Sequence, residues 1–193
     1  MAKLAILGSG SGSNMQSILD AIQQGSLEAE IVLVASDNPS GYILNRAQKA
    51  NIPTCIIDCH GYKSKFPKAE QESLAQKLKD LEVDLICLAG FMRLVGPALL
   101  SEFPDRILNI HPSLLPNYPG LHAWEQAIDD QASESGCTVH YVDAGMDTGE
   151  IISQSKVLIL PEDTPQTLHA RIQIEEHQLY PTTISRVLKN LEE

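Results

Sequence analysis

The chain has 193 residues, of which 43% are hydrophobic and 20% charged, and this is the composition of an ordinary globular domain rather than of a disordered chain. Its formal net charge of -11, from 14 basic and 25 acidic residues, argues against general binding to nucleic acid or to an anionic membrane. No apolar run approaches the roughly 18 residues of a transmembrane helix, and the N-terminal apolar stretch is shorter than a signal sequence requires. We therefore expect one compact domain in the cytoplasm that binds neither nucleic acid nor membrane.

The first half of the chain alternates apolar runs with amphipathic stretches. Residues 3–7 predict a buried strand and residues 8–14 a loop with three glycines, and a first helix follows from the spacing of the next apolar residues. Further strands are predicted at 31–35, 54–57, 84–89 and 106–110, with helices around 43–47, before Leu81 and at 97–103. This alternation is typical of βαβ units, and it predicts an open, mostly parallel, twisted sheet with helices on both faces.

The second half departs from that rhythm. Three prolines interrupt residues 111–122, and a helix is predicted near 123–130. The runs 137–143 and 151–160 mix polar and apolar residues and are joined without a crossover helix, so we expect two antiparallel neighbours. Thr164, followed by Pro165, is expected to start the last helix. The predicted fold class is α/β, with a Rossmann-like N-terminal half and antiparallel strands late in the chain.

The loop Gly8–Asn14 carries more glycine than a simple strand-to-helix turn needs. Glycines let the backbone approach a ligand, and the N–H groups at a helix N-terminus attract an anion, so this loop predicts a phosphate site. One alternative is a plain turn with Ser13 as the helix cap. Another is a dinucleotide site, because Gly8-x-Gly10-x-x-Ser13 partly matches the Rossmann pattern and Asp37 lies near the place of a ribose-binding acid.

Three polar residues later in the chain form a candidate reaction centre. Asn109 lies near the end of the fifth strand, and His111 follows at a spacing that places both side chains on one side of an extended segment. Asp147 lies in a turn between two glycines, and it would raise the pKa of the imidazole and orient the ring if it meets His111. The alternatives are a structural histidine, a turn aspartate, or a metal site that also uses His122 and His140, although no pair has standard zinc spacing.

Residues spread from the first strand to the last helix carry a resemblance to a known family. They are Gly8–Asn14, Leu88–Arg93, Asn109–Pro116, Tyr118–His122, Asp143–Gly149, Arg171–Gln173, Glu176-His177 and Tyr180-Pro181. These stretches resemble the phosphoribosylglycinamide formyltransferase family, one of the folate-dependent formyltransferases. The resemblance implies direct formyl transfer from 10-formyltetrahydrofolate, as cosubstrate, to the amine of glycinamide ribonucleotide in de novo purine biosynthesis, without a metal. It also implies one domain over 1–193, with a phosphate-binding half at about 1–105 and a folate and catalytic half at about 106–193.

The resemblance implies a role for each matching residue. Asn109, His111 and Asp147 match the catalytic positions, and the chemistry agrees, because an amide and an imidazole can stabilise an oxyanion while a carboxylate receives the proton of the amine. The residues expected to hold the ribonucleotide are Gly12, Ser13, Asn14 and Glu176. The residues expected at the folate site are Lys65, Met92, Arg93, Leu94, Val95, Asn109, Asp143, Ala144, Gly145, Met146 and Asp147.

Two positions depart from the family pattern. Lys65 stands where many members carry an arginine, so the charge is kept but the planar fork that grips a carboxylate is lost. Glu150 stands where a proline often follows the Asp-x-Gly turn, which predicts a less rigid loop. The expected partners are small-molecule substrates, and the oligomeric state, monomer or homodimer, is left open. A nucleotide-binding oxidoreductase and a non-catalytic ligand-binding homologue are the alternative functions.

Overall fold

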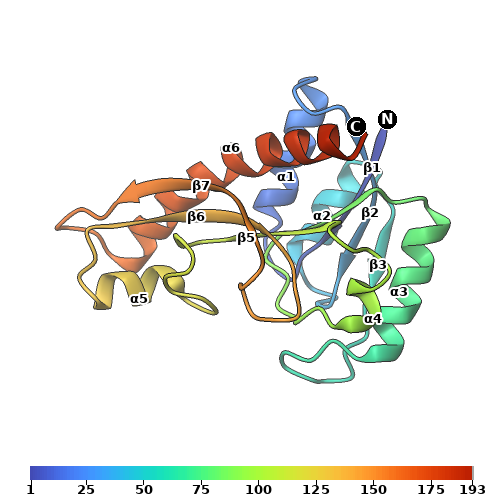
Figure 1. The fold of residues 1–193 in the computed structure, drawn as a ribbon, viewed down its shortest axis with the longest axis horizontal. Helices are drawn as coiled ribbons and strands as arrows, with labels where there is room; N and C mark the ends of the chain where they lie inside the picture. Colours follow the sequence, from blue (N-terminus) through green and yellow to red (C-terminus); the bar gives the residue numbers. More distant parts are fainter. Residues whose placement is uncertain (193) are drawn as a thin grey trace.

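A seven-stranded sheet runs through the computed structural model, which describes residues 1–192 (Figure 1). Residue 193, the expected end of the second half, lies outside the described residues. The strands are β1 (Ala2–Leu7), β2 (Ala29–Ser36), β3 (Thr54–Ile56), β4 (Leu85–Leu88), β5 (Ile107–His111), β6 (Glu134–Tyr141) and β7 (Ile151–Leu158). The helices are α1 (Ser13–Gln23), α2 (Tyr42–Lys49), α3 (Lys68–Asp80), α4 (Pro97–Leu100), α5 (Ala123–Asp129) and α6 (Pro165–Glu192).

The strand order is β3-β2-β1-β4-β5-β6-β7. The first five strands pair in parallel, whereas β6 is antiparallel to both β5 and β7. The predicted fold class is therefore confirmed, including the late antiparallel pair. Because parallel strands end at the same edge of a sheet, the loops after β1, β4 and β5 gather there. In Figure 1 this edge faces the lower side, away from both chain ends.

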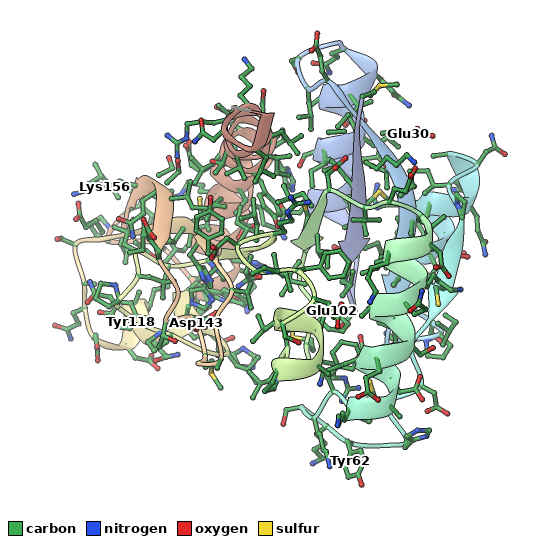
Figure 2. All side chains as sticks on the ribbon, turned by 45° about the vertical axis from the view of Figure 1, so that its right-hand side comes forward. Glu30, Tyr62, Glu102, Tyr118, Asp143 and Lys156 are labelled. Carbon is green, nitrogen blue, oxygen red and sulfur yellow. The ribbon has the colours of Figure 1, made fainter. Side chains whose placement is uncertain are left out.

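Alternate side chains of the central strand β1 are buried on opposite faces of the sheet. Leu4 and Ile6 join a core with α1, α2 and α6, whereas Ala5 and Leu7 join a core with α3 and α4. Figure 2 shows the side chains between the sheet and these helices, with the exposed Lys156 at the outer surface. Helices cover both faces of the sheet, as the sequence predicted. They do not cover the edge at which the parallel strands end, so ligands can bind there.

A few boundaries differ from the sequence expectation. α4 stops short of Phe103, because the residue before Pro104 is disfavoured in the helical region. α6 begins where expected and continues through Pro181. β6 begins at Glu134 rather than Cys137, because its first residues pair with the end of β7. None of the described helices combines the length and the apolar character needed to span a membrane.

Candidate active site

A cleft of about 660 Å³ opens at the carboxyl edge of the sheet. Its walls come from the glycine loop after β1, the segments after β4 and β5, the turn between β6 and β7, and one face of α6. Ligands of open α/β sheets bind at this edge. The predicted site residues that line the cleft are Gly12, Ser13, Asn14, Met92, Arg93, Leu94, Val95, Asn109, His111, Asp143, Gly145, Met146, Asp147 and Glu176.

The glycine loop places the N-terminus of α1 in the cleft. Gly12 caps this helix in a left-handed conformation, with a φ of 72°, and a Cβ there would come within 2.7 Å of the Ile43 backbone, so only glycine fits. Within residues 1–192, no side chain caps α1 and no acidic residue lies in its first turn. The alternative with Ser13 as the cap is therefore wrong. Ser13 is the first helical residue, and the N–H groups of this turn can bind an anion.

Asn14 and Glu176 connect α1 with α6 at the same end of the cleft. The Asn14 amide donates a hydrogen bond of 2.9 Å to the Glu176 carboxylate. Glu176 is buried, and burial raises its pKa to about 7 although this hydrogen bond opposes the shift. The Oδ1 atom of Asn14 is buried and has no hydrogen-bond partner among the described residues, so it can accept a hydrogen bond from a ligand. Both residues were expected at the ribonucleotide, and the structure brings them together.

Three polar side chains meet within the cleft. Asn109 and His111 come from β5, and the turn after β6 brings Asp147 against them. The Asn109 amide donates to Asp147 Oδ1 at 3.4 Å, and His111 Nδ1 lies 3.4 Å from Asp147 Oδ2. The side chains of His111 and Asp147 are only 6% and 12% exposed. The structure therefore joins the three residues that the sequence singled out as a reaction centre.

The carboxylate of Asp147 is fixed by its backbone and by a loop. Its φ of 55° is left-handed, which is uncommon for a residue other than glycine and is concentrated at functional sites. The Gly120 N–H donates to Asp147 Oδ2 at 2.8 Å. Burial pushes the pKa of Asp147 upward, but the interactions with His140, His111 and Gly120 outweigh burial and hold it below the ordinary value. Asp147 is therefore an ionised carboxylate at neutral pH.

The imidazole of His111 lies between two acceptors in a buried position. Burial lowers the pKa of His111, and it outweighs the opposing effects of Asp147 and of the Tyr118 carbonyl. Asp147 does raise the pKa of His111, as the sequence analysis expected. The net change in that pKa is nevertheless downward, because burial has the larger effect. Nε2 lies 2.9 Å from the Tyr118 carbonyl while Nδ1 faces Asp147. This orientation suits the doubly protonated ring, which a negative charge developing nearby would stabilise.

His140 belongs to the same cluster, although the sequence suggested it only as a possible metal ligand. Its Nε2 atom lies 3.2 Å from the Asn109 amide nitrogen and 3.7 Å from Asp147 Oδ1, while Nδ1 lies 2.7 Å from the Tyr141 carbonyl. The signal for His140 is the pairing of β5 with β6, where Asn109 and His140 are direct partners. Among residues 1–192, no group of three or more His, Cys, Asp or Glu is arranged to hold a metal ion.

Another wall of the cleft is formed by the segment after β4. Met92 and Leu94 are about half exposed there, at 50% and 49%. Arg93 also lines the cleft, but its guanidinium is bound inside the protein. Its Nε lies 2.5 Å from Asp37 Oδ2, and Nη1 donates to the Tyr62 carbonyl. The segment therefore offers apolar side chains and backbone groups to a ligand, while the charge of Arg93 is already paired.

Two residues expected at the folate site do not line the cleft. The backbone of Lys65 pairs with Leu94 in an isolated parallel bridge, and Lys65 Nζ lies 4.8 Å from the centre of the Tyr62 ring. The neighbouring Lys63 lines the cleft instead. Ala144 lies in the turn after β6, between residues that do line the cleft. A folate contact by Lys65 or Ala144 stays a prediction.

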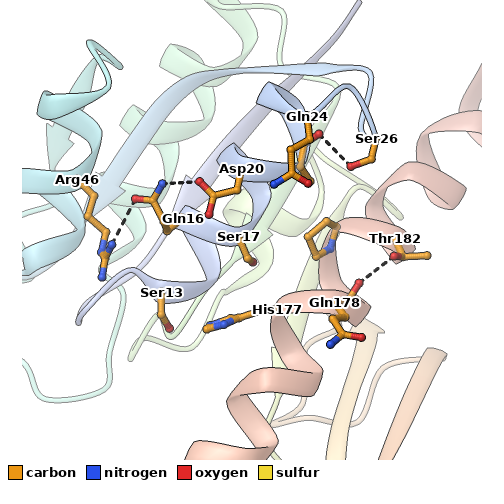
Figure 3. A pocket seen from close by; sticks show the side chains of 12 residues that line it. Ser13, Gln16, Ser17, Asp20, Gln24, Ser26, Arg46, His177, Gln178 and Thr182 are labelled. Atoms are coloured by element: carbon orange, nitrogen blue, oxygen red, sulfur yellow. Dashed lines mark hydrogen bonds between the residues drawn. The ribbon is translucent and has the colours of Figure 1, made fainter.

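A second groove, of about 530 Å³, lies between α1 and α6 and meets the cleft at Ser13 (Figure 3). In Figure 3 the His177 ring projects from α6 toward Ser13. The groove has polar walls, but its carboxylate, Asp20, accepts a hydrogen bond of 2.8 Å from Gln16. The cleft, with its linked amide, imidazole and carboxylate, is therefore the candidate active site.

The fold and the cleft define a class of protein, the open α/β proteins whose ligands bind at the carboxyl ends of their parallel strands. Comparison with known proteins agrees with this class. The family described as formyl transferase matches residues 2–184. A phosphoribosylglycinamide formyltransferase from Bacillus subtilis (strain 168) is 40% identical over 188 residues, which cover 97% of this chain and 95% of the relative.

Two further matches extend this likeness. The crystal structure of phosphoribosylglycinamide formyltransferase from Bacillus halodurans is similar with a TM-score of 0.91 and 47% identity, over 96% of this chain and 95% of that chain. The trifunctional purine biosynthetic protein adenosine-3 of Drosophila melanogaster is 44% identical over 96% of this chain, which spans only 14% of that protein. The chain belongs to the formyl transferase family.

Proposed function

We propose that the protein transfers a formyl group from 10-formyltetrahydrofolate to the amine of glycinamide ribonucleotide, a step of de novo purine biosynthesis. The observation that carries this proposal is the contact of Asn109, His111 and Asp147 in one cleft that also holds the N-terminus of α1 and an apolar wall. Such a cleft suits a reaction between a phosphorylated amine and a large planar cosubstrate. The names of the Bacillus relatives support the same activity.

The ribonucleotide would occupy the end of the cleft near α1. Its phosphate binds the N–H groups of Gly12 and Ser13, where the helix terminus favours negative charge. Asn14 and Glu176 lie beside this terminus and are already joined by a hydrogen bond. The Glu176 carboxylate and the unpartnered Asn14 Oδ1 supply acceptors for the amine or its neighbouring groups.

The folate would occupy the wall formed after β4 and β6. Met92, Leu94 and Met146 offer half-exposed apolar surface to its ring system. Val95, Asp143 and Gly145 complete this part of the lining, and the backbone of Arg93 contributes N–H and C=O groups. The positive charge of Lys65, outside the cleft lining, is proposed to attract the folate carboxylate at the rim, with Ala144 shaping the turn.

The reaction proceeds by direct attack. The amine nitrogen forms a bond to the formyl carbon, and the carbonyl π electrons move to oxygen to give a tetrahedral intermediate. Asn109 and protonated His111 donate hydrogen bonds to this oxyanion, in place of the contacts that each makes with Asp147 in this structure. Asp147, which is ionised, accepts the proton lost by the attacking nitrogen, directly or through a water. The intermediate then expels the folate nitrogen, which takes up a proton, and no step is assigned to a metal.

A spectrophotometric assay of the purified protein with a 10-formylfolate donor tests this function. We expect release of the deformylated folate only when glycinamide ribonucleotide is also present, and omission of each substrate in turn is the control. Binding of the ribonucleotide in calorimetry without turnover would instead support the non-catalytic alternative. Binding of a nicotinamide nucleotide would support the oxidoreductase alternative.

We propose that the partners of this protein are small molecules and that it is located in the cytoplasm.

A further inference from the structure

Asp37, the first residue after β2, lies where a dinucleotide-binding fold would use an acid to bind ribose. Its side chain is only 3% exposed. Ser9 Oγ donates a hydrogen bond to Oδ1, and Arg93 Nε donates to Oδ2 at 2.5 Å. Both carboxylate oxygens are thus engaged by residues of this chain, which disfavours the dinucleotide alternative and leaves the purpose of Asp37 to be explained.

The partners of Asp37 come from two neighbouring segments, the glycine loop after β1 and the segment after β4, and both segments line the cleft. Ser9 is the second residue of the glycine loop, and its hydroxyl also accepts a hydrogen bond of 2.9 Å from the backbone N–H of Met92. The backbone N–H of Ser9 donates to the Gly90 carbonyl at 3.0 Å. Two connections therefore join the glycine loop to the segment after β4. One is made by direct hydrogen bonds, and the other passes through the Asp37 carboxylate.

Arg93 extends this network to a third segment. Its side chain is 13% exposed, and besides Asp37 it donates to the carbonyl of Tyr62. Tyr62 directly precedes Lys63 and Ser64, which line the cleft. A buried ion pair with convergent hydrogen bonds has few alternative geometries, because displacing either partner leaves an uncompensated charge in a dry place.

We propose that Asp37 is a positioning residue, which sets the distance between the loop that binds the ribonucleotide and the segment that binds the folate. This inference rests on the proposed function. The amine and the formyl carbon are carried by different ligands, so their alignment depends on how these two loops are held relative to each other. Misplacement by about 1 Å is enough to cost roughly a hundredfold in rate.

Asp37→Asn is the variant that tests this role. Asparagine has nearly the same shape, but it places an amide beside Arg93 or Ser9 and removes the charge. We expect kcat to fall by roughly tenfold or more, because alignment fails. Calorimetric affinities for glycinamide ribonucleotide alone and for tetrahydrofolate alone should change by less than about threefold, because neither ligand touches Asp37.

The chain offers a matched control at Asp163. This carboxylate is also buried, at 4% exposed, and it also accepts from a hydroxyl, Thr167 Oγ1, and from an arginine, Arg171. None of these three residues lines the cleft. We expect both Asp37→Asn and Asp163→Asn to lower the melting temperature. Asp163→Asn should, however, leave kcat at the wild-type value.

Ser9→Ala provides a second variant that keeps the buried ion pair and tests the same network if Asp37→Asn fails to fold. We expect a smaller fall in kcat, and the double variant should lose less than the product of the two single losses, because both remove one connection. Wild-type protein without formyl transfer would overturn the proposed function and this inference with it. Two results with an active wild type would overturn this inference alone. In the first, the Asp37 and Ser9 variants have the same kcat as Asp163→Asn. In the second, they lose ligand affinity in parallel with kcat.

Discussion

His140 stands directly opposite Asn109 in the antiparallel pairing of β6 with β5, and its Nε2 atom lies 3.2 Å from the Asn109 amide nitrogen. The same nitrogen donates to Asp147 Oδ1 at 3.4 Å. The two N–H bonds of the amide thus face an imidazole and a carboxylate, and the contact with Asp147 is the longer one. An oxyanion formed in the cleft would displace the contact with Asp147, while His140 keeps the amide oriented.

Removal of the Asn109 amide tests this arrangement. Asn109→Ala should lower kcat by roughly 10²–10³-fold, the range for loss of one oxyanion donor. The binding of each substrate should change far less, because the developing charge exists only in the transition state. Steady-state kinetics with calorimetry on both ligands measures the two quantities. An unchanged kcat would exclude the amide from the reaction.

Asp147→Asn should lose roughly 10²–10⁴-fold in kcat, because the amide cannot accept the proton of the amine. The variant keeps an acceptor oxygen for the Gly120 N–H, so the loop should stay in place. If Asp147 and His111 act as a unit, His111→Ala in the Asp147→Asn background should add little further loss. Multiplicative losses in the double variant would show that the two residues act independently.

Ser13→Asp tests which end of the cleft binds phosphate. A carboxylate in the first turn of α1 would repel a doubly charged phosphate at short range, so KM for glycinamide ribonucleotide should rise strongly. Binding of a folate analogue should be nearly unchanged. Ser26→Asp, just beyond the other end of α1, makes the same change of charge and should leave both affinities intact. Loss of folate binding alone would mean that the two ends are assigned the wrong way round.

Glu176→Gln should change the pH dependence of stability. The pKa of Glu176 is raised to about 7 in the folded protein, against 4.5 as the ordinary value. The folded state therefore holds its proton longer than the unfolded state, and this carboxyl lowers the free energy of unfolding progressively as pH rises from about 4.5 to 7. The cost above pH 7 is on the order of 3 kcal/mol, since each pKa unit corresponds to about 1.4 kcal/mol.

The glutamine variant stays neutral and lacks this penalty. Its free energy of unfolding, relative to that of the wild type, should therefore be greater at pH 8 than at pH 5, as measured by urea denaturation at both pH values. The other titrating groups are the same in both proteins, so their contributions cancel in the difference between the two free energies of unfolding. If the difference in free energy of unfolding between the two proteins is the same at both pH values, the pKa of Glu176 is not raised in the folded protein.

The fold and most of the cleft could be predicted because their signals are local. A glycine loop between a strand and a helix, and the spacing of Asn109 and His111 on one strand, need no knowledge of distant residues. The role of His140 depends on the register between β5 and β6, which no short pattern encodes. The pairing of Arg93 with Asp37 likewise joins residues far apart in the chain, so the sequence predicted that Arg93 lines the cleft but not that its charge is paired with Asp37.

The segment between β5 and α5 holds His111 and Asp147 through its main chain, by the carbonyl of Tyr118 and the N–H of Gly120. Tyr118, Gly120 and His122 all have left-handed backbones, so the path of this segment is tightly specified. The spacing of this segment therefore matters more than the chemistry of its exposed side chains. A library that randomises the exposed Asn117 at constant length should retain many active members, whereas deletion of one residue would shift the contacts with His111 and Asp147 together.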